Sequence, residues 1–200
     1  MGFVRSEPEK TTSAKFLVAG GFGAGKTTFV EIISEIVPVR TEAELTSAGV
    51  GVDENPDVPG KTSTTVAMDF GRITLAGGVM LHLFGTPGQH RFWFMWDDLA
   101  RGAIGAIVLA DTRRLADSFS AIDFFESKEL PFVVAVNQFP GARPHTSDEV
   151  REAVSVGAGV PVIRCDARSA ESIKQALITA SEHAIAVRRP VPRHDAGQIR

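Results

Sequence analysis

The segment Gly20 to Thr27 has residue types and spacing suited to chemistry on phosphate. It reads G-G-F-G-A-G-K-T and matches the phosphate-binding pattern G-x-x-x-x-G-K-[ST]. Glycines let backbone N–H groups turn inward around an anion, and a following helix N-terminus adds positive potential. Lys26 is the cation expected on the β- and γ-phosphates, and Thr27 offers its hydroxyl to Mg²⁺. The expected nucleotide-binding residues here are Gly20, Gly21, Phe22, Gly23, Ala24, Gly25, Lys26, Thr27 and Thr28.

The elements around this loop must position it between a strand and a helix. An apolar run at 15–19 predicts the strand, and helical spacing from 28 to 37 predicts a helix that stops at Pro38. Residues 41–61 are polar and predict a long loop. Further strands are expected at 64–75, 79–84, 103–110, 132–136 and 160–164, and further helices at 115–126, 148–154 and 170–187. This alternation predicts an α/β fold with a mainly parallel six-stranded sheet, one antiparallel strand, and helices on both faces.

Length and composition suit one domain with two tails. The chain has 200 residues, of which 44% are hydrophobic and 22% charged. The net charge of -3 argues against nucleic acid as a partner, and the lone Cys165 fits a reducing compartment. No apolar run reaches the roughly 18 residues of a membrane span, so no integral membrane segment is expected. We expect a flexible arm at 1–14, one domain at 15–187, a disordered basic tail at 188–200, and a cytoplasmic location, with peripheral membrane contact through partners as an alternative.

Several stretches together resemble a known family. These are AGGFGAGKTTFV, TTVAMDFGRITL, LFGTPGQHRFWFMWDDLARGAIGA and PFVVAVNQF. The chain resembles the Ras superfamily, and within it the bacterial Ras-like small GTPases related to MglA, of the actinobacterial conservon type. The resemblance implies a P-loop NTPase (Ras-like) domain that binds GTP/GDP with Mg²⁺ and acts as a signalling switch.

The resemblance also assigns the two switch segments. Thr65, with Thr64 as the alternative, is similar to the switch I threonine that binds Mg²⁺ and the γ-phosphate. The motif F-G-T-P-G-Q is similar to switch II, so Gly88 would donate its N–H to the γ-phosphate and Gln89 would orient the attacking water. Gly85 stands where the family usually has an aspartate, which implies weaker Mg²⁺ binding and slow unaided hydrolysis.

The base-binding motifs match the family only partly. Asn137 and Gln138 open the sequence N-Q-F-P, which resembles Asn-Lys-x-Asp, and Asn137 is expected to tie the phosphate loop to the base site. Pro140 cannot supply the carboxylate that reads guanine, so we expect reduced selectivity, with guanine still preferred over adenine. The sequence D-A-R resembles Ser-Ala-Lys, and its expected base-site residues are Asp166, Ala167 and Arg168.

Partners are implied by the resemblance and by aromatic residues. The segment Phe92 to Trp96 is expected to divide between core and surface, and exposed aromatics are typical of interfaces. The resemblance implies a Roadblock-type, MglB-like regulator and a sensor-kinase-like protein from the same operon. Arg72 and Arg91 are candidates for a catalytic arginine. Two other functions stay open: a nucleotide-dependent scaffold with little or no hydrolysis, and a P-loop ATP-binding protein.

Overall fold

The computed structural model describes residues 12–45, 64–75, 77–88 and 90–188. Within these ranges the strands are β1 (Ser13–Ala19), β2 (Val39–Leu45), β3 (Thr64–Thr74), β4 (Met80–Gly85), β5 (Ala103–Ala110), β6 (Phe132–Asn137) and β7 (Val162–Cys165). The helices are α1 (Lys26–Ile33), α2 (Trp96–Ala100), α3 (Phe119–Ser127), α4 (Ser147–Ala153) and α5 (Ala170–Arg188), with 3-10 helices η1 (His90–Met95) and η2 (Leu115–Ser118).

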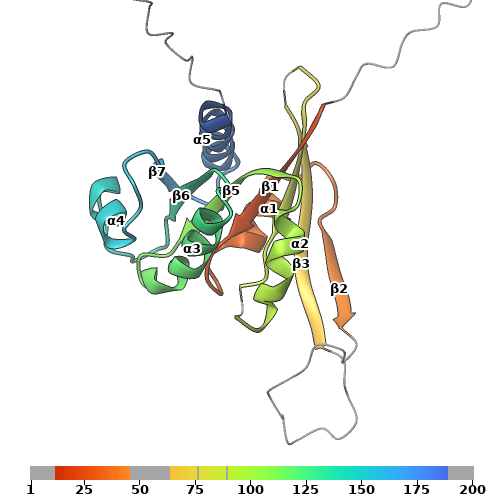
Figure 1. The fold of residues 1–200 in the computed structure, drawn as a ribbon, viewed down its shortest axis with the longest axis horizontal. Coiled ribbons are helices and arrows are strands. Elements are labelled where there is room, and N and C mark those ends of the chain that lie inside the picture. The colour runs from red at the N-terminus through yellow and green to blue at the C-terminus, as the bar shows by residue number, and fades with distance from the viewer. Residues whose placement is uncertain (1–11, 46–63, 76, 89, 189–200) are drawn as a thin grey trace, which may run out of the picture.

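The described strands form one sheet in the order β2-β3-β4-β1-β5-β6-β7 (Figure 1). Pairing is parallel from β4 to β7, whereas β3 runs antiparallel to both β4 and β2. The predicted fold class is therefore confirmed, with one antiparallel strand, but the sheet has seven strands instead of six.

The additional strand is β2, which corrects the prediction of a loop from residue 41. It pairs with β3 along its whole length, from Val39 opposite Phe70 to Leu45 opposite Thr64. Its sequence V-R-T-E-A-E-L places a charged residue at every second position, which is the period of a strand. The polar composition of this segment obscured that alternation. Residues 46–63 of the predicted loop lie outside the described part of the chain.

Helix α1 is shorter than predicted and ends at Ile33, because Ser34 stops it. The backbone N–H of Ser34 still bonds to Val30, but the Ser34 hydroxyl bonds to the backbone of Ile36. The same hydroxyl accepts a hydrogen bond from the Arg72 N–H at 3.3 Å. These bonds turn the chain away from helical geometry and attach the end of α1 to β3.

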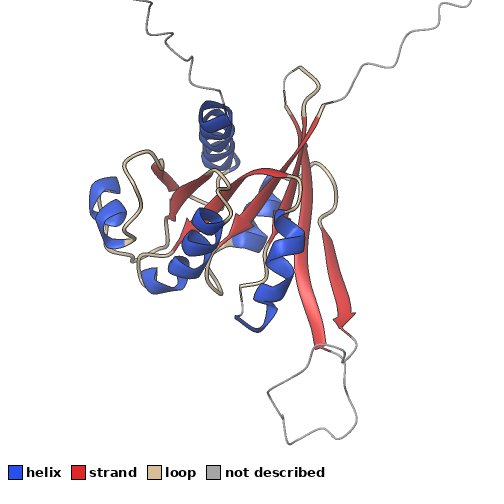
Figure 2. Cartoon of the chain, viewed as in Figure 1, coloured by secondary structure: helices blue, strands red, loops and turns tan. Residues whose placement is uncertain are grey.

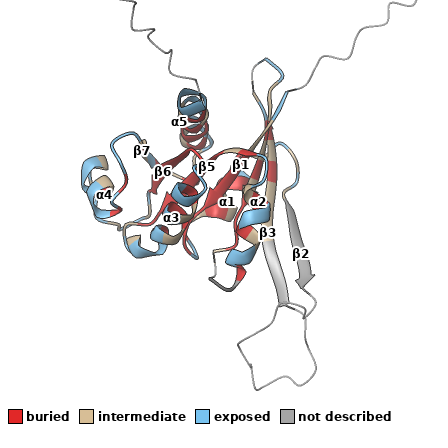
Figure 3. Cartoon of the chain, viewed as in Figure 1, coloured by how far each residue is buried: buried red, intermediate tan, exposed pale blue. Residues whose placement is uncertain are grey.

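Helices cover both faces of the sheet, and each face has its own apolar core (Figures 2 and 3). The core under α1 and α5 includes Phe16, Phe29, Leu83, Ile107 and Ile173. The core under α2, α3 and α4 includes Leu17, Trp96, Val108, Phe125 and Val150. Successive residues of β1 from Phe16 to Ala19 face opposite cores, which is why this half of the strand is apolar on both faces. No helix in the described ranges is long and apolar enough to cross a membrane.

Candidate functional site

The phosphate loop joins β1 to α1 at the carboxyl edge of the parallel strands, where open α/β sheets bind ligands. Two glycines are required by its path. Gly25 has φ +102°, and a Cβ there would lie 2.5 Å from Asn137 Nδ2. A Cβ on Gly20 would lie 2.4 Å from the carbonyl oxygen of Leu109. The loop is therefore wrapped closely against the ends of neighbouring strands.

Lys26 is buried inside this loop. Its ammonium donates to the carbonyl oxygens of Gly20 at 2.8 Å and Gly21 at 2.7 Å. Burial lowers the pKa of Lys26 to about 8, although the carboxylate of Asp69 acts in the opposite direction. The charge is thus held where an anionic ligand would compensate for its lost hydration.

A carboxylate that sequence reasoning missed lies beside Thr27. The hydroxyl of Thr27 donates to Asp69 Oδ2 at 2.6 Å. Asp69 is the register partner of Gly85, and a Cβ on Gly85 would lie 3.1 Å from Asp69 Oδ2. The carboxylate of Asp69 therefore fills the space next to the motif glycine. A lone acidic residue in the otherwise apolar V-A-M-D-F stretch was the available signal.

The segment after β4 closes against the phosphate loop. A Cβ on Gly88 would lie 2.7 Å from the ammonium of Lys26 and 3.1 Å from the Phe22 nitrogen. Gln89, the predicted water-orienting residue, lies outside the described residues. Thr65 belongs to β3, but its side chain is likewise outside what the structure describes. The switch roles of Thr65 and Gln89 stay predictions.

Asn137 joins the phosphate loop to the loop after β7. Its side-chain amide donates to the carbonyl oxygen of Ala24 at 2.9 Å, and its Oδ1 accepts from the Ala167 N–H at 3.0 Å. The N–H of Ala167, one of the expected base-site residues, thus already donates to Asn137. Asp166 accepts three hydrogen bonds of 2.9 Å from Arg168, one from its backbone N–H and two from its guanidinium.

Gln138 and Pro140 are exposed at the end of β6, where the base-reading motif was expected. The N–H of Gln138 donates to the Cys165 carbonyl at 2.8 Å, which links this loop to β7. Phe139 lies between them, and the guanidinium of Arg113 stacks 3.9 Å from its ring centroid. The structure thus places an aromatic and a cation here, and Pro140 brings no carboxylate.

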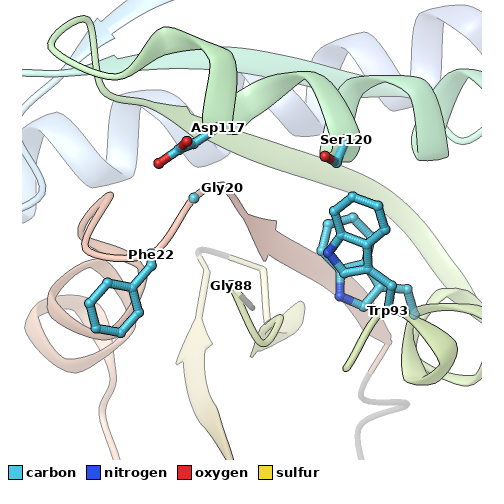
Figure 4. A pocket seen from close by; sticks show the side chains of 8 residues that line it. Gly20, Phe22, Gly88, Trp93, Asp117 and Ser120 are labelled. Atoms are coloured by element: carbon cyan, nitrogen blue, oxygen red, sulfur yellow. The ribbon is translucent and has the colours of Figure 1, made fainter. Parts of the chain in front are cut away.

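A cavity of about 260 Å³ lies beside the phosphate loop (Figure 4). It is lined by Gly20, Gly21, Phe22, Gly88, Trp93, Trp96, Asp117 and Ser120. As expected, the aromatic residues divide: Phe92 and Trp96 are buried, whereas Phe94 is 61% exposed and Trp93 is partly exposed. The indole N–H of Trp96 donates to the Pro87 carbonyl at 3.3 Å and so fastens the segment after β4 to the core.

The fold and this loop define the class of protein. A strand–glycine loop–helix unit with a buried lysine, set in a mixed sheet, is the arrangement of P-loop nucleotide-binding proteins. Similar solved structures are the cytosolic domain of the FeoB iron transporter of T. maritima in apo form and the FeoB G-domain of Methanococcus jannaschii. The first has a TM-score of 0.62 at 18% identity, covering 90% of this chain and 66% of that chain. The second has a TM-score of 0.59 at 13% identity, covering 87% and 99%.

Those likenesses show a GTPase-like G-domain fold, and a closer comparison shows the family. The chain belongs to the family described as conserved hypothetical ATP binding protein, which matches residues 18–187. It is also 30% identical over 131 residues to the uncharacterized protein MJ1339 of Methanocaldococcus jannaschii, covering 64% of this chain and 72% of that protein.

Proposed function

We propose that this protein is a GTP/GDP-binding molecular switch in bacterial signalling, of the MglA-related conservon type, with slow GTP hydrolysis that a partner accelerates. The observation that carries the proposal is the pairing of Thr27 with Asp69 beside the buried Lys26. A phosphate-binding cation and a hydroxyl–carboxylate pair lie together at the start of α1. Phosphoryl transfer from a metal-bound nucleotide requires these groups: a cation for the phosphates and oxygen ligands for the metal.

The Thr27–Asp69 pair fits Mg²⁺ in its chemistry. Mg²⁺ prefers oxygen ligands and is bound in such sites by one or two protein oxygens together with substrate phosphates. Asp69 supplies from β3 the carboxylate that Gly85 cannot supply from β4. When bound, the ion neutralises charge on the β- and γ-phosphates. The hydroxyl of Thr27 would hold the ion, and Asp69 would hold the ion or one of its waters.

Hydrolysis would depend on the segment that begins at Gly88. Gly88 lies against Lys26 and would donate its N–H to the γ-phosphate, and Gln89 would orient the attacking water. The exposed Phe94 and partly exposed Trp93 follow a few residues later, so a partner that binds them would also lie close to this segment. A Roadblock-type, MglB-like regulator is the partner we propose for it. A sensor-kinase-like protein is the second partner.

The base is proposed to be guanine, with adenine as the second candidate. Asn137 supports guanine because it joins the loops at phosphate and base, as the Asn of the Asn-Lys-x-Asp motif does in the family that the chain resembles. Two observations favour adenine: Pro140 offers no carboxylate to the guanine edge, and the matching family is described as ATP binding. A scaffold that binds nucleotide without turnover is the remaining candidate.

The test is single-turnover GTP hydrolysis by wild type and Gln89→Leu, each with and without the Roadblock-type regulator. We expect slow hydrolysis alone, acceleration by the regulator, and loss of that acceleration in Gln89→Leu. Stabilisation of transition-state charge is worth roughly 10³–10⁵-fold where a partner provides it. Fast hydrolysis by the chain alone that Gln89→Leu leaves unchanged would overturn the mechanism. Bound GTP with no turnover under any condition would favour the scaffold.

A further inference from the structure

Two charged side chains that follow β5, those of Arg114 and Asp117, contact the phosphate loop from outside it. Arg114 donates a hydrogen bond from Nη2 to the carbonyl oxygen of Phe22. The same nitrogen lies 3.6 Å from the position of a Cβ on Gly23. Asp117 packs against Gly21 of the same loop. The Cβ of Asp117 lies 2.4 Å, and its Oδ2 3.0 Å, from the position that a Cβ on Gly21 would take. Figure 4 shows Asp117 directed toward the loop beside Gly20 and Phe22.

The two side chains also contact each other, and their segment is braced. Arg114 Nε lies 3.6 Å from Asp117 Oδ2. The backbone N–H of Arg114 donates to the Asp111 carbonyl at 2.9 Å, and the N–H of Asp117 donates to the Arg114 carbonyl at 3.1 Å. Asp111 is itself buried and held by two hydrogen bonds from the Arg113 guanidinium. Arg114 therefore projects from a short segment with a fixed backbone.

The hydrogen bond from Arg114 fixes the orientation of one peptide group. In a trans peptide the C=O of Phe22 and the N–H of Gly23 point in opposite directions. Holding the carbonyl on the Arg114 side therefore directs the Gly23 N–H to the other side of the loop. Phosphate loops bind anions through N–H groups that converge on the ligand.

We propose that Arg114, oriented by Asp117, is a positioning residue that holds the Phe22–Gly23 peptide in the phosphate-binding conformation. This proposal rests on the proposed function, because it concerns the binding of a nucleoside diphosphate or triphosphate at the same loop. Asp117 has the further effect of excluding any side chain at residue 21, since a Cβ there would overlap it. Arg114 and Asp117 therefore connect the segment at the start of η2 to the phosphate loop.

Solvent exposure separates this role from a purely structural one. The side chains of Arg114 and Asp117 are 52% and 44% exposed. Ion pairs at that exposure contribute little to folding stability. The removal of Arg114 should therefore change phosphate affinity much more than thermal stability.

The experiment is equilibrium titration with N-methylanthraniloyl-GDP in the presence of Mg²⁺, together with the thermal midpoint of each variant. We expect Arg114→Ala to raise Kd roughly tenfold or more, as the loss of a charged hydrogen-bond partner does. Arg114→Lys keeps a cationic donor and should recover part of the affinity. The matched control is Arg101→Ala, which removes an exposed arginine paired with Asp98 at 3.3 Å and should leave Kd unchanged.

The outcomes distinguish this proposal from the proposed function. Wild type that fails to bind the probe would overturn the proposed guanine-nucleotide site itself. Binding that is lost in Lys26→Ala but unchanged in Arg114→Ala would overturn only the positioning role. So would an Arg114→Ala variant with a lower thermal midpoint and an unchanged Kd, or an equal loss of affinity in Arg101→Ala.

Discussion

Lys26 places its ammonium where burial disfavours a charge. The desolvated site lowers its pKa to about 8, and the Asp69 carboxylate raises it by less. In the described structure its partners are carbonyl oxygens of Gly20 and Gly21, which are weaker partners than phosphate. A bound phosphate would raise the pKa again, so proton binding and nucleotide binding are linked at this residue.

We therefore expect nucleotide affinity to depend on pH in one direction. Below pH 8 Lys26 is protonated in both the free and the bound protein, so Kd should be flat. Above about pH 8 the free protein loses the proton that the complex retains, so Kd should rise with pH. Calorimetry at alkaline pH, in buffers with different ionisation enthalpies, should detect proton uptake on binding. A flat Kd with no proton uptake would contradict the linkage between nucleotide binding and protonation of Lys26.

At the residue scale, contiguous motifs could be predicted and contacts across the fold could not. The phosphate loop is readable because Lys26 and Thr27 follow its glycines directly in the sequence. Asp69 depends on which residue of β3 lies opposite Gly85, and that register appears only in the folded sheet. Arg114 was missed for the same reason, because nothing near it in sequence marks its contact with Phe22.

At the scale of elements, strand β3 carries a carboxylate, that of Asp69, next to the position on β4 where Gly85 stands instead of the usual aspartate. Gly85 leaves room at the end of β4, and Asp69 on the adjacent strand directs its carboxylate to Thr27. The sequence-based expectation of weak Mg²⁺ binding considered β4 alone. With the neighbouring strand included, the site has both a hydroxyl and a carboxylate.

We expect Asp69→Asn to weaken Mg²⁺ binding while preserving the fold, because the amide keeps the shape and removes the charge. Changes in groups that support a metal typically cost roughly 10–100-fold in metal affinity. The Mg²⁺ dependence of GDP dissociation measures this directly. Asp123→Asn, on the exposed side of α3, is the control and should match wild type. If Asp69→Asn had the Mg²⁺ dependence of wild type, Asp69 would have no part in the metal site.

The order of most strands and helices could be predicted, but the edge strand β2 and the short helix α2 could not. The inner strands β5 and β6 are apolar on both faces, so they stand out in sequence. The edge strand β2 alternates charged and uncharged residues, and its polar composition predicts a loop where the structure has a strand. Helix α4 shows how local bonds set an end: the side chain of Thr146 accepts from the Glu149 N–H, and the Glu149 carboxylate accepts from the Thr146 N–H. This capping box starts the helix at Ser147, one residue earlier than predicted.

At the scale of the whole molecule, the parallel strands end on one edge, and the candidate site is assembled there. β1 leads into the phosphate loop, β4 into Gly88, β6 ends at Asn137 and β7 leads into Ala167. Hydrogen bonds of Asn137 connect these loops across the edge. Loops from separate parts of the chain thus meet at one place, as nucleotide binding requires.

The measurement that tests the central proposal most directly is displacement of N-methylanthraniloyl-GDP by GDP, GTP, ADP and ATP, for wild type and Lys26→Ala. Lys26 lies in the loop and not in the apolar cores, so Lys26→Ala should fold and fail to bind tightly. For wild type we expect the guanine nucleotides to displace the probe at lower concentration than the adenine nucleotides. Pro140→Asp should widen that difference by restoring a carboxylate to the base loop. Displacement by ATP as effective as by GTP, unchanged in Pro140→Asp, would contradict the guanine switch, and tight binding by Lys26→Ala would contradict the phosphate site.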